Sequence, residues 1–518
     1  MTSQLTDITG ILRRGIEQHP DAEAVRFGEQ SHSWRRLDDR VRRGAAAQRA
    51  AGLSPGDRVA FLDKNHPTCV ETTLTCAMVG TVNAVVNFRL APDEVSYVVN
   101  DAAARVLFVG PEFLPVVEQI RDQLPTVERV VTVGGPDDGY ESWIDVDPIA
   151  DPHQPAPDDC FLQLYTSGTT GFPKGAMLTH RGMLEHSSAV AADTGLGPDS
   201  VAMVAMPLFH VGGSSWALVA LSAGARIVIV REPVPQQVLD GLERERITHT
   251  FFVPALLSFL VAVPDAAQRD YSALRCLCYG ASPMPLPLLR TCLQVFPTDF
   301  YQVYGMTEAA GVVTMLGPEE HRDPAHEHRL VSAGKPISGV EIEIRDPATG
   351  EDPLAAGESG EVWVRTEQLM AGYWRKPDET DNVLVAGGWL RSGDAGHLDD
   401  DGYLYVTDRI KDMIISGGEN IYPAEIERVL VEHPSVADLA VIGVPDEKWG
   451  EVPLAVVQAA PDTRVDEAEL LAYCRARLAS FKCPRSVTVV EALPRNPTGK
   501  ILKKDLRTPY WEGRTRQV

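Results

Sequence analysis

The most informative stretch of the chain is Tyr165-Thr166-Ser167-Gly168-Thr169-Thr170-Gly171-Phe172-Pro173-Lys174-Gly175. It follows a short apolar run, Cys160 to Leu164, which predicts a buried strand, and it precedes Arg181 to Ala192, which predicts a helix. A strand, a loop of glycines and hydroxyls, and then a helix is the layout of a phosphate-binding loop. A polar surface turn is the alternative interpretation.

The residue types of this loop suit a bound phosphate. Glycines let backbone N–H groups turn towards an anion and approach it closely, the hydroxyl groups add donors, and the lysine adds a positive charge. The loop lacks the Gly-Lys-Ser/Thr ending of a Walker loop, so we expect neither a motor ATPase nor a GTPase. The predicted phosphate-binding residues are Thr166, Ser167, Gly168, Thr169, Thr170, Gly171 and Lys174.

Length and composition narrow the class of protein. The chain has 518 residues, which is too long for one core and indicates two to four domains. A net charge of −24 argues against nonspecific binding to nucleic acid and against attraction to an anionic membrane. Eight cysteines occur without a paired metal-binding spacing, so we expect a reducing compartment, the cytoplasm, and no disulfide framework. Neither a signal peptide at residues 1–10 nor a membrane-spanning run of about 18 apolar residues is expected.

Helical and strand patterns alternate on both sides of the loop, which predicts an α/β fold. From residue 340 short alternating runs predict an antiparallel meander, and the last part of the chain alternates again. The predicted fold is a large N-terminal domain of mixed sheets with flanking helices and a β-meander, plus a small C-terminal α/β domain. The predicted strands of the large domain are 56–62, 82–86, 105–109, 202–206, 226–230, 249–253, 274–279 and 299–303, with helices at 67–80, 236–246 and 286–296.

Glycine-rich or polar segments follow several of these predicted strands. They are Pro207 to Gly213, which contains His210, then Gly280 to Pro283, and Gln302 to Glu308. Ligands of open α/β sheets bind at the carboxyl ends of strands, so we expect the three segments to share a site. Each also has a simpler explanation, namely a structural histidine, a plain turn and a carboxylate in a buried salt bridge.

The loop resembles the phosphate-binding loop of the adenylate-forming enzymes, which include acyl-CoA synthetases, the adenylation domains of peptide synthetases and firefly luciferase. The resemblance covers nearly the whole chain, with further motifs in the family's order and spacing. It is most specific in the loop itself and at Pro494 to Leu502. The other matching segments are Tyr304 to Glu308, Trp389 to Asp394, Asp408 to Ile415 and Ser416 to Pro423.

The resemblance implies a site for ATP and magnesium. Glu308 and Thr166 would hold Mg²⁺, which prefers a carboxylate plus phosphate oxygens. Thr307 would contact the α-phosphate, and Lys500 would be the catalytic lysine. The remaining residues that the resemblance assigns to ATP are Gly280, Ala281, Ser282, Gln302, Tyr304, Gly305 and Met306 around adenine, Asp394 at the ribose hydroxyls, and Arg409 at the ribose or phosphate.

The resemblance also implies a pocket for a carboxylic acid. His210 would lie near the carboxylate, and Ser214, Trp216 and Val303 would line the rest. Some long-chain relatives gate a fatty-acid tunnel with a tryptophan four residues after the histidine. Here that position is Ser214, and Trp216 lies two residues further on, so the sequence leaves the gating and the chain length open.

A large domain joined to a small mobile one is the family arrangement, and the matching boundary gives domains 1–410 and 411–518. Lys411 would be the hinge, although the segment around it could also be the edge of a strand. Rotation about Lys411 would exchange the groups at the site between two half-reactions. Gly417 and Gly418 would line the tunnel for the pantetheine arm of the thiol.

The reaction implied by the resemblance has two steps. A carboxylate attacks the α-phosphorus of ATP and releases pyrophosphate, and a thiol then displaces AMP. Bacterial fatty acyl-CoA synthetases are the subfamily that the chain resembles most, so we expect activation of a medium- or long-chain fatty acid and its transfer to coenzyme A. Transfer to the phosphopantetheine thiol of an acyl carrier protein, and an aryl-acid CoA ligase, stay open, as does the oligomeric state, which could be a homodimer. A non-catalytic nucleotide sensor is a remote alternative, against which the presence of Glu308 and Lys500 argues.

Overall fold

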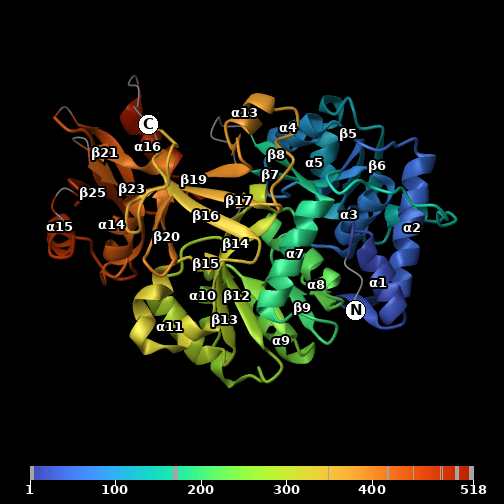
Figure 1. Cartoon of the computed structure of the whole chain (residues 1–518), viewed down its shortest axis with the longest axis horizontal. Helices are drawn as coiled ribbons and strands as arrows, with labels where there is room; N and C mark the ends of the chain where they lie inside the picture. Colours follow the sequence, from blue (N-terminus) through green and yellow to red (C-terminus); the bar gives the residue numbers. More distant parts are fainter. Residues whose placement is uncertain are drawn as a thin grey trace. The chain divides into compact units, whose positions relative to one another are not determined.

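The computed structural model describes residues 5–166, 173–347, 349–416, 419–446, 448–478, 480, 482–495 and 501–512, with the side chains of 411, 419 and 420 left out (Figure 1). The chain forms two compact units, of which the first comprises residues 1–341 and 364–390 and the second residues 342–363 and 391–518. The predicted domains, 1–410 and 411–518, are defined by a hinge at Lys411 and not by compact packing. Their boundary therefore stays a prediction. Within the described ranges, no helix combines the length and apolar composition needed to cross a bilayer.

The predicted phosphate-binding loop connects two strands of a six-stranded sheet in the first unit. Over the described residues the strand order is β6-β5-β3-β4-β7-β8, and every neighbouring pair is parallel except β7 and β8. β3 and β4 are buried along their whole length, as expected for strands of a parallel sheet with both faces covered. The strand bounds are β3 Arg58–Leu62, β4 Val82–Val85, β5 Ala104–Val109, β6 Arg129–Thr132, β7 Cys160–Thr166 and β8 Lys174–Thr179.

One feature of this sheet corrects the sequence prediction. The helix predicted at Arg181 to Ala192 is confirmed, but the predicted succession of strand, loop and helix is wrong, because β8 follows the loop and pairs antiparallel with β7, with Thr166 opposite Lys174. The helix, α7 (His180–Thr194), begins only after Thr179, whose hydroxyl accepts a 3.0 Å hydrogen bond from Gly182 N. Pairing with β7 satisfies the backbone of the short buried run that follows Lys174, and the lysine therefore lies at a strand end rather than before a helix.

A nine-stranded sheet makes up the rest of the first unit's core, with the order β15-β14-β13-β12-β11-β9-β10-β1-β2 over the described residues. Its central strands are parallel, whereas β2, β14 and β15 run antiparallel to their neighbours. The bounds are β1 Glu23–Phe27, β2 Gln30–Ser33, β9 Val201–Val204, β10 Arg226–Ile229, β11 His249–Phe252, β12 Cys276–Gly280, β13 Asp299–Met306, β14 Gly311–Leu316 and β15 Lys335–Pro336.

Helices of the first unit alternate with the strands (Figure 1). α3 shows how local sequence sets their ends: Pro67 occupies the first turn, the His66 ring accepts a hydrogen bond from Thr68 N, and Gly80 ends the helix at a φ of 78°. The helix bounds are α1 Gly10–Gln18, α2 Trp34–Ala50, α3 Pro67–Val79, α4 Pro92–Ala102, α5 Leu114–Gln119, α6 Gly139–Trp143, α8 Val211–Ser222, α9 Pro235–Arg244, α10 Pro254–Val261, α11 Leu286–Val295, α12 Pro318–Arg322 and α13 Pro377–Asp381.

The predicted meander forms a sheet with the order β16-β17-β19-β18, to which β20 adds beside β19. The bounds are β16 Val340–Arg345, β17 Gly360–Thr366, β18 Leu384–Val385, β19 Trp389–Leu398 and β20 Leu404–Arg409. In the second unit, α14 and α15 pack on a sheet of the order β22-β21-β24-β23, with β25 beside β24, around a core that includes Ile414, Ile426, Val457 and Leu470. Its bounds are β21 Ile414–Ser416, β22 Glu419–Ile421, β23 Val436–Asp446, β24 Gly450–Ala459, β25 Ser486–Val490, α14 Pro423–Leu430, α15 Glu467–Arg475 and α16 Lys503–Trp511.

Candidate active site

Glu308 receives two hydroxyl hydrogen bonds on the same carboxylate oxygen. The hydroxyl of Tyr373 donates to Oε1 at 2.7 Å, and that of Thr166 donates to Oε1 at 3.4 Å. Within the described residues, Oε2 accepts no hydrogen bond and the carboxylate has no lysine or arginine partner. These contacts do not support the alternative interpretation of Glu308 as one half of a buried salt bridge, and they leave one oxygen available to a cation.

Lys174 lies close to this group through the same tyrosine. Its Nζ is 4.4 Å from the centroid of the Tyr373 ring and 2.9 Å from Oε2 of Glu379. The structure thus connects two predicted ATP-site residues, Lys174 and Glu308, by way of Tyr373. Sequence reasoning identified neither Tyr373 nor Glu379, because no motif or spacing marks a contact between positions so far apart in the chain.

Helix α4 holds both ends of the predicted phosphate-binding loop. The Tyr165 hydroxyl, just before the loop, donates to Asp101 Oδ2 at 2.8 Å, and the Tyr97 hydroxyl donates to the carbonyl of Pro173, just after it, at 3.3 Å. The ends of the loop are therefore fixed independently of any ligand. The predicted phosphate-binding residues Ser167, Gly168, Thr169, Thr170 and Gly171 themselves lie outside the described residues.

The two segments predicted to contact adenine are neighbours, because β12 and β13 pair in parallel with Gly280 opposite Val303. Gly280 has no room for a side chain, since a Cβ there would lie 2.1 Å from the carbonyl oxygen of Val303. The next residue, Ala281, has a φ of 63°, a region that residues with a side chain seldom adopt and that is common at functional sites. Ser282 follows it and is exposed.

Gln302 has a buried polar atom without a partner. Its Nε2 donates to the carbonyl of Val303 at 3.4 Å, whereas its Oε1 is buried and accepts no hydrogen bond from the described residues. A buried amide oxygen in this state is unfavourable unless a ligand supplies a donor. An exocyclic amino group such as that of adenine is a donor of the required kind.

The backbone is closely packed around Thr307, which starts the short helix Thr307–Ala309 and is buried. Tyr304, Gly305 and Met306 end β13 with a register shift between the first two. A Cβ on Gly305 would lie 1.9 Å from the carbonyl oxygen of Gly311, so only glycine fits this approach of two strands. This packing fixes the path of the chain into Glu308.

His210 is neutral and has one defined tautomer. It caps helix α8, and its Nδ1 accepts a 3.0 Å hydrogen bond from Gly212 N. Burial lowers the pKa of the ring to about 4. The proton of the neutral ring therefore resides on Nε2, which makes that atom a hydrogen-bond donor.

The other predicted pocket residues use their polar atoms within the fold. The Ser214 hydroxyl donates to the carbonyl of Leu208, and Trp216 Nε1 donates to the carbonyl of Met203 at 3.0 Å. Both side chains are buried, as is Val303. These three side chains consequently offer a ligand no free hydrogen-bond donor.

Two further predicted residues come together in the second unit. Asp394 of β19 lies opposite Arg409 of β20, and Arg409 Nε is 2.7 Å from Asp394 Oδ1. Lys411 lies in the short helix Ile410–Asp412, and its side chain is outside the description. The predicted residues Gly417, Gly418 and Lys500 also lie outside the described residues.

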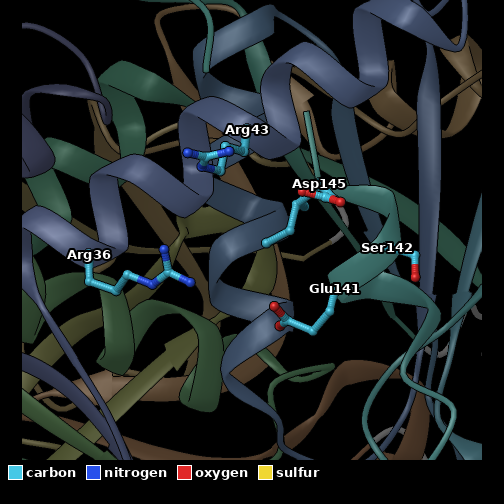
Figure 2. A pocket seen from close by; sticks show the side chains of 6 residues that line it. Arg36, Arg43, Glu141, Ser142 and Asp145 are labelled. Atoms are coloured by element: carbon cyan, nitrogen blue, oxygen red, sulfur yellow. The ribbon is translucent and has the colours of Figure 1, made fainter. Parts of the chain in front are cut away.

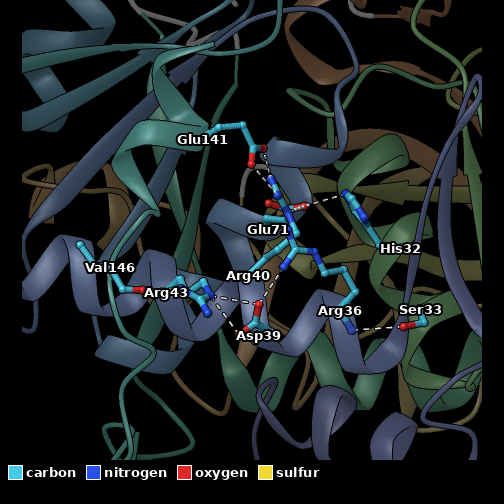
Figure 3. A network of polar contacts seen from close by, with 9 residues as sticks. All are labelled: His32, Ser33, Arg36, Asp39, Arg40, Arg43, Glu71, Glu141 and Val146. Atoms are coloured by element: carbon cyan, nitrogen blue, oxygen red, sulfur yellow. Dashed lines mark hydrogen bonds and ion pairs between the residues drawn. The ribbon is translucent and has the colours of Figure 1, made fainter.

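A surface pocket of about 450 Å³ lies between α2 and α6, and none of the predicted site residues lines it (Figure 2). Its two arginines are already engaged: Arg36 donates to Asp39 at 2.9 Å, and Arg43 donates to Asp39 and to the carbonyl of Val146 (Figure 3). The neighbouring Arg40 joins the buried Glu71 to the exposed Glu141. Because both arginines are already paired, the pocket offers no strong site for an anion.

The fold and these residues define an adenylate-forming enzyme. Two family profiles match the chain: that of the AMP-binding enzymes over residues 12–374, and that of the AMP-binding enzyme C-terminal domain over residues 425–500. The chain therefore belongs to the AMP-binding enzyme family.

Relatives of known activity agree with this assignment. Fatty acid–[acyl-carrier-protein] ligase ScoC of Streptomyces coeruleorubidus is 39% identical over 513 residues, which cover 97% of this chain and 96% of that protein. Feruloyl-CoA synthase of Amycolatopsis sp is 41% identical over 500 residues, covering 96% and 98%. The crystal structure of anthranilate CoA ligase AuaEII in complex with anthranoyl-AMP matches with a TM-score of 0.88 at 27% identity, over 98% of both chains. This chain is an AMP-forming acid–thiol ligase, which activates a carboxylic acid with ATP.

Proposed function

We propose that the enzyme activates a medium- or long-chain fatty acid as its acyl adenylate and transfers the acyl group to the thiol of coenzyme A. The observation that carries the proposal is the one-sided carboxylate of Glu308, with both hydroxyl hydrogen bonds on Oε1 and none from the described residues on Oε2. Within those residues, no three histidine, cysteine or acidic side chains gather as a metal cage. A single carboxylate that shares its metal with phosphate oxygens is the usual arrangement for Mg²⁺.

Each group then has a part in the first step. Glu308 and Thr166 would hold magnesium, which neutralises charge on the phosphates of ATP when bound. Lys174 and the loop before it would stabilise the charge that builds up on the departing pyrophosphate, and Lys500 would bridge the reacting groups. Gln302 Oε1 would accept a hydrogen bond from the amino group of adenine, which supports ATP as the nucleotide.

The acid would bind beside His210. Its Nε2–H can donate to the carboxylate of the acid without carrying a charge, so the ring orients the acid and leaves its nucleophilicity largely intact. The side chains of Ser214, Trp216 and Val303 favour a hydrocarbon chain, since they leave no free hydrogen-bond donor for a polar substituent of the acid.

Two alternatives keep support from the relatives. The similarity to ScoC favours an acyl carrier protein as acceptor, and the similarity to feruloyl-CoA synthase favours an aryl acid. Coenzyme A and a carrier protein present the same phosphopantetheine arm, so the residues that meet the thiol do not distinguish them. The number of subunits in solution stays open.

A pyrophosphate-release assay with acids of graded chain length, together with hydroxylated and plain aryl acids, tests the proposal. Coenzyme A or a phosphopantetheinylated carrier protein is supplied as the acceptor. We expect the highest kcat/KM with a medium- or long-chain fatty acid and faster AMP release with coenzyme A. Preference for a hydroxylated aryl acid would contradict the proposed substrate, and acceleration by the carrier protein alone would contradict the proposed acceptor.

A further inference from the structure

The ammonium group of Lys174 has an internal counter-ion. Lys174 is the first residue of β8 and is 8% exposed. Its Nζ lies 2.9 Å from Oε2 of Glu379, a side chain that is 26% exposed. A buried ammonium group needs a compensating negative charge, and in the described residues Glu379 is the carboxylate that supplies it.

Lys174 and Glu379 attract each other by charge, but they form no well-directed hydrogen bond. Oε2 of Glu379 is buried and accepts no hydrogen bond from the described residues, although Lys174 Nζ lies near it. The oxygen has thus left water without gaining a directed donor in return, which is unfavourable for a carboxylate. Another anion with better geometry could replace Glu379 at Lys174.

Backbone hydrogen bonds on both sides keep the pair in place. Trp374 N donates to the carbonyl of Gly175 at 2.8 Å, next to Lys174 in the chain. The hydroxyl of Thr380, which follows Glu379 on helix α13, accepts a 2.9 Å hydrogen bond from Tyr373 N. Figure 1 shows α13 in the same region as β8. Glu379 is therefore positioned by the fold and does not reach Lys174 by chance from a free surface loop.

The position of Lys174 brings phosphate oxygens into competition with this carboxylate. Lys174 is the last of the predicted phosphate-binding residues and lies opposite Thr166, whose hydroxyl contacts Glu308. Phosphate oxygens carry more negative charge than a carboxylate and accept several donors at once. A bound triphosphate that reaches Lys174 would offer it the better partner.

We propose that Glu379 is the counter-ion that Lys174 exchanges for the β- and γ-phosphate oxygens of ATP, and that Glu379 thereby sets the affinity of the enzyme for ATP. The inference rests on the proposed function, because it takes Lys174 as a ligand of the departing pyrophosphate. Glu379 stabilises the nucleotide-free enzyme and opposes ATP binding. Removal of its charge therefore destabilises the nucleotide-free enzyme and strengthens ATP binding.

Glu379→Gln tests this exchange, because it keeps the size of the side chain and removes the charge. The melting temperature is measured for wild type and variant without nucleotide, with ATP and Mg²⁺, and with AMP. We expect Glu379→Gln to melt lower than wild type without nucleotide and to gain more from ATP. The KM for ATP in acid-dependent pyrophosphate release should fall about threefold, the size expected for a partly exposed ion pair. AMP has no β- or γ-phosphate, so its stabilising effect should be equal in the two proteins.

Glu23→Gln is a matched control. Glu23 is 21% exposed and pairs with Arg226 at 2.6 Å, in the first unit but outside the candidate site. This variant should lower the melting temperature by the same amount with and without ATP. Glu379→Asp keeps the charge and shortens the side chain, and it provides the same comparison in weaker form if Glu379→Gln does not fold.

The outcomes separate this inference from the proposed function. In the first outcome, ATP raises the melting temperature of wild type, and Glu379→Gln lowers the melting temperature by the same amount with and without ATP. Glu379 would then be only a structural partner of Lys174, and the inference alone would be overturned. The inference would also be overturned if AMP raised the melting temperature of Glu379→Gln more than that of wild type, because the α-phosphate would then be the group that competes with Glu379. Wild type that neither gains stability from ATP nor releases pyrophosphate with any acid would overturn the proposed function as well.

Discussion

The hydroxyl of Tyr373 donates a 2.7 Å hydrogen bond to Oε1 of Glu308. The two residues are far apart in sequence, and the segment that carries Tyr373 also donates from Met370 N to the carbonyl of Glu308 at 2.8 Å. Both contacts fix the orientation of the glutamate, so that Oε1 is occupied and Oε2 is left for a cation. Tyr373 is therefore a positioning residue for the carboxylate that we assign to magnesium.

Tyr373→Phe should raise the concentration of Mg²⁺ needed for half-maximal pyrophosphate release by roughly tenfold, because it removes one hydrogen bond to a charged group. The measurement is a magnesium titration at saturating ATP and acid. Tyr271→Phe is the control, since Tyr271 donates to the carbonyl of Ala266 at 2.7 Å in a buried place outside the site. An unchanged magnesium requirement in Tyr373→Phe would mean that its hydroxyl has a purely structural role.

Glu308→Gln should slow adenylation by roughly two to three orders of magnitude, because the variant loses the negative charge that binds the metal. The shape of the side chain is kept, so the melting temperature should change little. Single-turnover release of pyrophosphate measures the effect. Near-normal activity in magnesium would refute the assignment of Glu308.

Lys500→Ala should block formation of the acyl adenylate and spare formation of the thioester from a supplied acyl adenylate. The reason is that Lys500 is needed only in the arrangement that carries out the first step, if the small domain rotates. Lys500 lies outside the described residues, and the prediction rests on the sequence motif Pro494 to Leu502. Equal loss in both half-reactions would indicate a structural role or a role in both steps.

Lys411→Pro should leave adenylation near the wild-type rate and slow thioester formation at least roughly tenfold, about 1.4 kcal/mol of barrier, because proline restricts the backbone that must rotate. On either side of Lys411, Asp408 and Asp412 form ion pairs with Lys503 and Arg507 of α16 at 3.5 and 3.0 Å. Paired single-turnover assays measure the two steps. Wild-type rates in both would contradict the hinge, and a joint fall with a lower melting temperature would indicate damage to the fold.

Stability should decrease as the pH is lowered from about 6.5 towards 4. Burial lowers the pKa of several histidines to about 4, below the value near 6.5 in the unfolded chain, so the unfolded state binds more protons in this window. The contribution of these neutral histidines to stability is complete above about pH 6.5 and is lost as the pH falls from there towards 4. Melting temperatures measured at about pH 7, 6 and 5 check the slope, and a flat profile would contradict it. The histidines concerned are His66, His180, His186, His210 and His249.

Much of the α/β framework could be predicted because its strands are local patterns. β3, β5 and β10 are short apolar runs bounded by turn residues, and the structure places strands there within a residue or two. β8 was missed because its apolar run is only a few residues long and leads directly into α7. Its existence depends on pairing with β7 rather than on its own periodicity.

The candidate site also contains residues that a local pattern marks and residues that only long-range contacts bring in. Thr166, Glu308 and Lys174 belong to contiguous motifs, so the sequence predicts them as site residues. Tyr373 and Glu379 come near them only because the segment after β17 lies along β8. The sequence also did not reveal that Ser214 and Trp216 use their polar atoms inside the fold. Such long-range contacts leave no local trace in the amino-acid pattern.

Acid-dependent exchange of labelled pyrophosphate into ATP, with no thiol present, tests the central claim most directly. The first half-reaction is reversible, so an enzyme that forms an acyl adenylate returns the label to ATP only when its acid is present. We predict exchange with a medium- or long-chain fatty acid in the presence of Mg²⁺, and its near loss in Glu308→Gln. No exchange with any fatty or aryl acid, from a folded protein that binds ATP, would contradict the account.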